Sequence, residues 1–202
     1  MTEQEWYTLL NKKQLSNRKL RLFSVSCCYD IWDFLTDQRS KDVIIAAEQF
    51  ADGLITKQEL ETARDLAWNA YSAVAGRAAS VAGWAAANAA AANAAGWATA
   101  WNAYSAVAAA SVKVREQKEK LYCQFLNDIV GNKQTIIDPR WLTSTVIDLS
   151  QTIYEEKVFE RMPILSDALM DAGCDDNDIL SHCREGIHVR GCWLLDLILE
   201  KS

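Results

Sequence analysis

The chain has 202 residues and a mass of 22.6 kDa, which suits one domain or one domain that carries an elaborated element. Its formal net charge of −6 and its pI near 5.0 argue against a nucleic-acid-binding protein, because such a protein neutralises phosphates with a basic face. Half of the residues are apolar, and two prolines and eight glycines are too few for the many tight turns of an all-β protein. Composition therefore favours an all-α fold with a hydrophobic core.

The first third of the chain predicts three helices. A short helix covers residues 2–10, and Asn17 caps a second one whose apolar residues recur every three or four positions over residues 20–34. A third helix is capped by Ser40 and ends at Gly53, a residue type that readily adopts the left-handed conformation which closes helices.

A long alanine-rich segment follows a helix-start motif. Thr56 and Glu59 have the spacing of a capping box, in which each side chain hydrogen-bonds the backbone amide of the other residue. Beyond this motif, residues 66–112 consist mainly of Ala, Asn, Gly, Ser and Trp, with Arg77 as the single charged residue. Because alanine has the highest helix propensity, this segment is predicted to be helical despite its glycines.

The alanine-rich segment contains an internal repeat. The sequence AWNAYSAVA occurs at residues 67–75 and again at residues 100–108, an offset that fits the period of a straight helix. One continuous helix would align its aromatic residues in a ridge, whereas a break at one of the glycines would produce a helical hairpin with closely approaching faces. Both arrangements remain open.

Exposed aromatic residues in a row form an apolar patch, which either packs against the short helices of the same chain or contacts another protein chain. The predicted interaction residues are Trp68, Tyr71, Trp97, Trp101 and Tyr104.

The C-terminal part is predicted to be a cluster of short helices. A charged helix ends at Gly131, residues 138–141 form a turn, and Pro163 occupies the first position of a later helix. Three segments result, namely residues 1–55, 56–131 and 132–202, which together form one composite domain. The expected all-α architecture packs the short helices of both ends around or beside the long alanine-rich helix or hairpin.

Both ends of the chain resemble a family of uncharacterised proteins abundant in planctomycete-type bacteria. The resemblance rests on SNRKLRLFSVSCCYDIWDFLTDQRS, AEQFADG and DPRWLT, and on the long motif MPILSDALMDAGCDDNDILSHCREGIHVRGCWLLDLILEK. It covers roughly residues 1–65 and 120–202. The resemblance implies that the two ends flank a middle of variable length, often rich in Ala and Trp. It implies no activity, cofactor or substrate, and the low charge of this middle departs from the Arg- and Asp-studded versions of the family.

Cysteine and histidine residues gather near the C-terminus. Both histidines and half of the six cysteines lie within residues 174–192. If residues 188–192 are helical, His188 and Cys192 share a face, as a pair of metal ligands would. His182 and Cys183 are neighbours on a helix, so only one of the two is expected to face a site. The candidate zinc ligands are Cys174, Cys183, His188 and Cys192, although their spacing matches no standard zinc motif. The alternative is that the cysteines are buried as small apolar residues and the histidines satisfy backbone groups.

Catalytic motifs are missing from the sequence. A cysteine nucleophile paired with His182 or His188 would need a lowered pKa, which the sequence does not indicate, and there is no phosphate-binding glycine loop, GxSxG or HExxH motif. We therefore expect a non-catalytic protein that assembles with itself or binds a protein partner, with a small zinc-binding regulatory or enzymatic domain as the alternative. The start of the chain has no signal-peptide pattern, so a cytoplasmic protein with reduced thiols is expected, and neither nucleic acid nor membrane is an expected partner.

Overall fold

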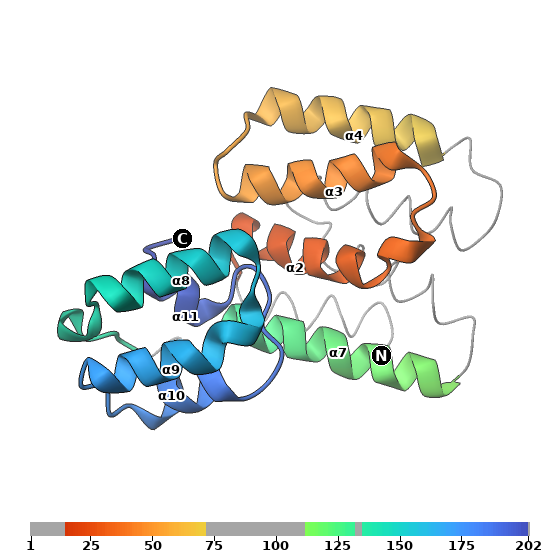
Figure 1. Cartoon of the computed structure of the whole chain (residues 1–202). Coiled ribbons are helices and arrows are strands. Elements are labelled where there is room, and N and C mark those ends of the chain that lie inside the picture. The colour runs from red at the N-terminus through yellow and green to blue at the C-terminus, as the bar shows by residue number, and fades with distance from the viewer. Residues whose placement is uncertain (1–14, 72–111, 132–134, 202) are drawn as a thin grey trace. The chain divides into compact units, whose positions relative to one another are not determined.

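The computed structural model describes residues 15–71, 112–131 and 135–201, and within these ranges the chain is helical without any strand (Figure 1). This confirms the all-α fold class. In the same ranges no helix is both long and apolar enough to cross a membrane. The predicted helix over residues 2–10 and most of the alanine-rich segment lie outside the described residues. The described α-helices are α2 (Asn17–Asp30), α3 (Gln38–Ala51), α4 (Lys57–Tyr71), α7 (Val112–Val130), α8 (Ser144–Glu156), α9 (Met162–Asp171), α10 (Asn177–Arg184) and α11 (Trp193–Ile198).

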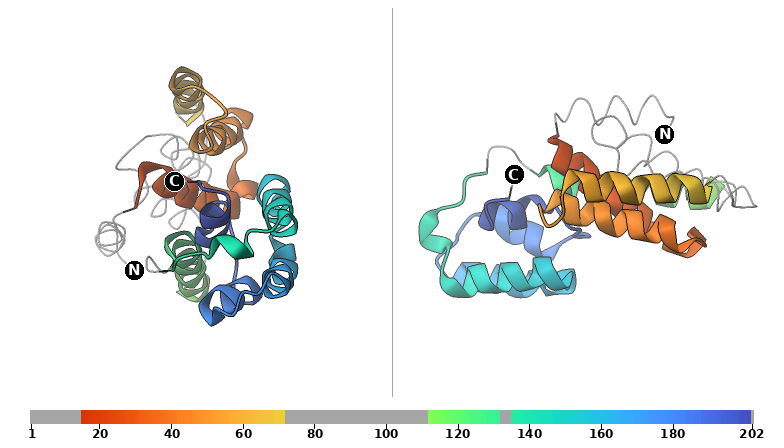
Figure 2. Two further views of the ribbon diagram at one scale, coloured as in Figure 1. Left: turned by 90° about the vertical axis from the view of Figure 1, so that its left-hand side faces the viewer. Right: turned by 90° about the horizontal axis from the view of Figure 1, so that it is seen from above.

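The chain divides into two compact units at the boundary between Cys123 and Gln124, which falls inside α7. In the first unit, α3 packs against both α2 and α4. Figure 2 shows α3 and α4 side by side, joined by a short connection. That connection begins at Gly53, whose φ of 71° confirms the predicted left-handed helix end.

Helix starts in the first unit are set by short side chains that accept amide hydrogens. Ser16 caps α2 by accepting from the amide of Lys19, and Asp37 caps α3 by accepting from the amide of Arg39. The predicted caps Asn17 and Ser40 are therefore wrong by one and three positions. Ser40 lies inside α3 and is buried. The capping role falls to the carboxylate of Asp37, which satisfies a free amide of the first turn.

The capping box at the start of α4 is confirmed. The amide of Thr56 donates to Oε2 of Glu59 at 2.7 Å, and the amide of Glu59 donates to Oγ1 of Thr56 at 3.3 Å. These contacts lower the pKa of the Glu59 carboxyl, first through the backbone amide of Thr56 and then through its hydroxyl. Both residues are local in sequence, which is why the motif could be recognised there.

The N-terminal part of α7 is tied to α2 by a polar contact in the first unit. Nζ of Lys118 lies 2.6 Å from Oδ1 of Asp30, and the hydroxyl of Tyr122 donates to Oδ2 of Asp30 at 3.1 Å. Next to this contact, the side chains of Cys27, Cys28 and Tyr122 are fully buried.

Burial shifts the ionisation of the two adjacent cysteines of α2. Burial raises the pKa of the Cys28 thiol. For Cys27, burial and the neighbouring charges of Cys28 and Asp30 together raise the pKa well above the ordinary value. None of the six cysteines, all of which lie in the described ranges, forms a disulfide.

These thiols predict a loss of stability in alkaline solution. A thiol whose pKa is raised by folding stabilises the protein fully below the unfolded pKa of about 8.5, and this contribution is lost as the pH rises towards the folded pKa. Each such thiol should lower the free energy of unfolding by about 1.4 kcal/mol per pH unit in that window. Urea denaturation between neutral and alkaline pH measures the slope, and Cys28→Ala should make it shallower. An identical slope in the variant would contradict the prediction.

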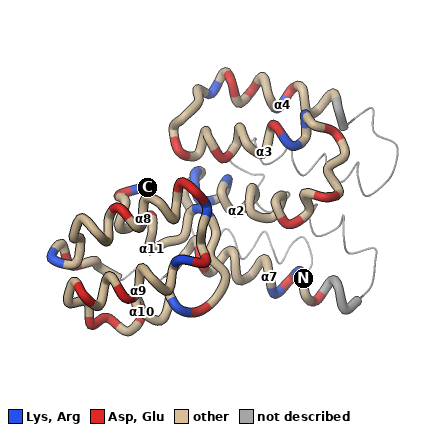
Figure 3. The backbone as a smooth tube through the Cα atoms, in the orientation of Figure 1, with Lys and Arg blue, Asp and Glu red and all other residues tan. Residues whose placement is uncertain are grey.

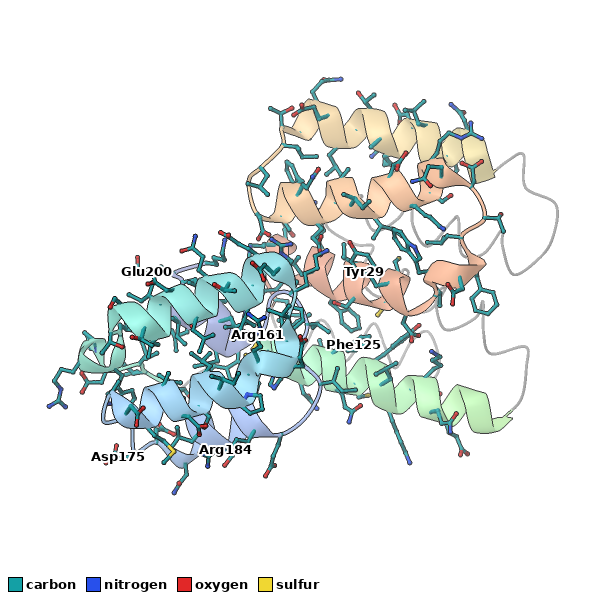
Figure 4. The ribbon with its side chains drawn as sticks, in the orientation of Figure 1. Tyr29, Phe125, Arg161, Asp175, Arg184 and Glu200 are labelled. Atoms are coloured by element: carbon teal, nitrogen blue, oxygen red, sulfur yellow. The ribbon has the colours of Figure 1, made fainter. Side chains whose placement is uncertain are left out.

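The second unit holds α8, α9, α10 and α11 around one hydrophobic core. Contacts join α9 to α10, α8 to α9 and α8 to α11, and Figure 4 shows side chains of these helices filling the space between them. Gly131 has a φ of 59°, and a Cβ at this position would overlap with the side chain of Trp193. The close approach of the Trp193 indole to the backbone thus requires glycine at this position.

Charged residues of both signs are interspersed along the described helices (Figure 3). In the second unit, for example, Arg184 at the end of α10 lies 3.4 Å from Oδ1 of Asp167 on α9. Both side chains are substantially exposed, so this ion pair contributes little to stability.

Candidate metal centre

Four side chains with metal-binding atoms converge in the second unit. Asp128 belongs to the last turn of α7, His182 to α10, His188 to the connection after α10, and Cys192 immediately precedes α11. One potential ligand atom from each of these residues lies within 4.8 Å of every other, and we call this group the Asp–His–His–Cys cluster. The fold therefore brings Asp128 to residues that follow it by more than 50 positions.

Asp128 is held in place by two donors. Its Oδ1 lies 2.8 Å from Nδ1 of His188, and its Oδ2 accepts the amide hydrogen of Val189 at 2.9 Å. The side chain is only 3% exposed. A buried carboxylate is stable only when such groups compensate for its loss of hydration. This carboxylate is thus oriented towards the two histidines by a backbone contact as well as by a side chain.

His182 contacts two neighbours through its two ring nitrogens. Its Nε2 lies 3.1 Å from Sγ of Cys192, and its Nδ1 accepts the indole hydrogen of Trp193 at 3.2 Å. Burial lowers the pKa of His182, the carboxylate of Asp128 opposes this effect and His188 adds to it, and the pKa is about 4 as a result. His182 is therefore neutral at physiological pH, the form in which imidazole binds metals.

Cys192 is fully buried, and its surroundings keep the thiol protonated in the absence of a metal. Burial raises its pKa well above the ordinary value, and the carboxylate of Asp128 raises it further, while the amides of Leu195 and Leu194 act in the opposite direction. A buried thiol with a raised pKa is a poor nucleophile. These surroundings do not favour cysteine catalysis at this position, whereas a metal ion would displace the proton and bind the thiolate.

The hydrogen bonds of the cluster form a consistent chain. Trp193 donates to His182, and with the ring proton on Nε2, His182 donates to the sulfur of Cys192. The carboxylate of Asp128 lies close enough to this thiol to raise its pKa. These contacts satisfy polar atoms of the cluster without a metal, so the protein can fold in the metal-free form. A bound metal ion would displace protons that take part in these contacts.

The donor set and spacing of the cluster fit a transition metal. One carboxylate, two imidazoles and one thiolate form a mixed ligand set that zinc accepts readily. In a tetrahedral zinc site with bonds of about 2.0–2.3 Å, neighbouring ligand atoms lie about 3.3–3.6 Å apart. The contacts Asp128–His188, His182–Cys192 and His182–Asp128 measure 2.8, 3.1 and 3.5 Å. These three distances lie within about half an ångström of that spacing, and the remaining pairs of ligand atoms lie within 4.8 Å of each other.

The cluster borders an open depression of about 180 Å³. Asp128 and His182 form part of its wall, which also includes Gln124, Asn127 and Glu185. Solvent therefore has a path to one side of the cluster.

The structure brings together two of the four predicted zinc ligands. His188 and Cys192 belong to the cluster, whereas Cys174 and Cys183 belong to the hydrophobic core of the second unit. The expectation that only one of His182 and Cys183 faces a site agrees with this geometry, His182 being the one. The assumed helix over residues 188–192 is wrong, because this segment forms a turn in which the amide of Cys192 donates to the carbonyl of Val189.

Sequence reasoning did not identify Asp128 and did not include His182 among the ligands. Asp128 lies far in sequence from the Cys/His-rich segment. The one feature that distinguishes it from other acidic residues is that Phe125 and Ile129, its apolar neighbours along α7, are buried. A carboxylate at the edge of an apolar helix face indicates that the carboxylate is buried next to a group that binds it, because an unpaired buried charge is costly.

The predicted interaction residues are described only in part. Trp68 lies on α4 and is 51% exposed, and Tyr71 is the last residue of that helix. Trp97, Trp101 and Tyr104 lie outside the described residues. The aromatic ridge therefore stays a prediction.

Comparison of the chain with family models, with curated proteins and with solved structures gave no match. The resemblance of both ends to a planctomycete-type family accordingly stays a prediction, and the functional argument depends on the geometry of the site.

Proposed function

We propose that residues 124–202 form a small helical metal-binding unit whose physiological ion is zinc. The observation that carries this proposal is the convergence of Asp128, His182, His188 and Cys192 within 4.8 Å. These residues come from α7, from α10 and from the segment between α10 and α11, so an ion bound among them would link the end of α7 to a part of the chain more than 50 residues further on. Such a link stabilises the folded chain, because the unfolded chain does not present a preformed site.

Metal analysis of protein purified without a histidine tag tests the proposal. We expect near-stoichiometric zinc in the wild type and a strong loss in Cys192→Ala, because this variant lacks the thiolate. Cys174→Ala is the matched control, since Cys174 is also a buried cysteine of this unit but lies outside the cluster. Circular dichroism would confirm that both variants are folded. Wild-type protein that neither contains zinc nor takes it up, or equal losses in both variants, would contradict the proposal.

Self-association through the alanine-rich segment is a second proposed function. It is favoured by the side chains of Leu66 and Trp68, each 51% exposed near the end of α4, where the first copy of the repeat begins. Exposed apolar side chains of this size are typical of contact surfaces. Homo-oligomers formed in this way would bring the repeat of one chain to that of another.

Light scattering on a sizing column, over a wide concentration range, measures this association. We expect a dimer or larger species, and a shift towards 22.6 kDa monomer in the double variant Trp97→Ala with Trp101→Ala. A monomeric wild type would refute self-association, and a cooperative loss of the fold in the variant would place these tryptophans in the core instead.

A further inference from the structure

The indole of Trp193 determines which nitrogen of His182 carries a proton. Tryptophan Nε1 is only a donor, and it lies 3.2 Å from Nδ1 of His182, so this nitrogen must accept. In a neutral imidazole the proton then resides on Nε2, the nitrogen that faces Cys192 and Asp128.

This protonation pattern conflicts with coordination of a metal by His182. A histidine that binds a metal through Nε2 carries its proton on Nδ1 and normally donates it to an acceptor. In this protein the neighbour of Nδ1 is another N–H group, so two hydrogens would point at each other. His182 can therefore coordinate through Nε2 only if Trp193 moves away.

The position of Trp193 is itself fixed by the backbone. The indole packs against Gly131, where even a Cβ would overlap with Cγ and Cδ1 of the ring. The side chain is only 9% exposed, which leaves little room for another rotamer.

Building on the proposed metal unit, we propose that the centre has three protein ligands, Asp128, His188 and Cys192, and an open fourth position. The Nε2–H group of His182 points at this position and would donate a hydrogen bond to its occupant. The occupant is thus water, hydroxide or a small anion that binds the metal and accepts a hydrogen bond. Three protein ligands with one exchangeable position are typical of zinc centres that bind or activate small molecules.

The surroundings of the cluster agree with an exchangeable ligand of small size. His182 and Asp128 line the depression of about 180 Å³, which gives the fourth position access to solvent. The carboxylate of Glu185 on the same wall disfavours large or highly charged anions, and the amides of Gln124 and Asn127 offer hydrogen bonds to a small polar ligand.

Cobalt(II) substitution of the whole chain, with azide as the probe anion, tests the open position. Cobalt replaces zinc with the same ligands and has visible absorption bands that respond to each ligand. We expect azide to change these bands saturably in the wild type. Cobalt binding without any response to azide would overturn the open position but leave the proposed metal unit intact, whereas no cobalt binding would overturn both.

Three variants separate the roles of the residues. His182→Ala should weaken cobalt binding only about tenfold, as expected for a residue outside the ligand set, whereas Cys192→Ala should weaken it on the order of a thousandfold. Trp193→Phe keeps an aromatic ring but removes the indole donor, so His182 can become the fourth ligand and the azide response should disappear. An equally large loss of affinity in His182→Ala and Cys192→Ala, or an unchanged azide response in Trp193→Phe, would overturn the inference.

Discussion

Asp128→Ala is expected to lower the free energy of unfolding of the metal-free protein by about 3 kcal/mol, because it removes a buried acceptor shared by several donors. The amide of Val189 and Nδ1 of His188 both contact this carboxylate, at 2.9 and 2.8 Å, and both would lose their partner. A buried donor left without an acceptor retains the full penalty for its loss of hydration.

Urea denaturation followed by circular dichroism measures this effect, and zinc must be removed beforehand so that metal binding does not contribute. Asp148→Ala is the matched control, because Asp148 is an exposed aspartate of α8 in the same unit. We expect the control to change the denaturation midpoint little. Similar midpoints for the two variants would show that the contacts of Asp128 do not stabilise the fold.

Gly131→Ala is the second substitution with a large expected effect, again a loss of about 3 kcal/mol. The positive φ of 59° contributes about 1 kcal/mol of backbone strain for alanine, and the overlap with Trp193 contributes about 2 kcal/mol more. Displacement of Trp193 would also free His182, so this variant affects the metal site as well as the fold.

A glycine elsewhere in the chain separates strain from overlap. Gly53 has a φ of 71°, but a Cβ at this position would meet no atom within 4 Å. Gly53→Ala should therefore lose only the backbone contribution of about 1 kcal/mol. Equal denaturation midpoints for Gly53→Ala and Gly131→Ala would contradict the close packing of Trp193.

Sequence reasoning predicted those features that depend on neighbouring residues. The capping box of Thr56 and Glu59 and the left-handed helix end at Gly53 are local patterns, and both are confirmed. Two helix starts were misplaced because several residues with capping side chains stand close together. At the start of α3, Asp37 and Ser40 can both cap, and the hydrogen bond from the amide of Arg39 to the carboxylate of Asp37 shows that Asp37 does.

The candidate site was predictable only in part, because its geometry depends on contacts between distant segments. His188 and Cys192 were recognised from their proximity in sequence. Composition could not distinguish Cys174 and Cys183, which pack in the core, from cysteines that face polar partners. The role of Asp128 depends on the packing of α7 against the segment after α10, and no local pattern records that contact.

Calorimetric titration of the metal-free, untagged whole chain with zinc is the direct test of the proposed metal unit. We expect one zinc ion to bind per chain with submicromolar affinity, an affinity that Cys192→Ala reduces and Cys174→Ala retains. The absence of zinc binding by the folded wild-type protein would contradict the claim, and the Asp–His–His–Cys cluster would then be a hydrogen-bonded network that stabilises the second unit.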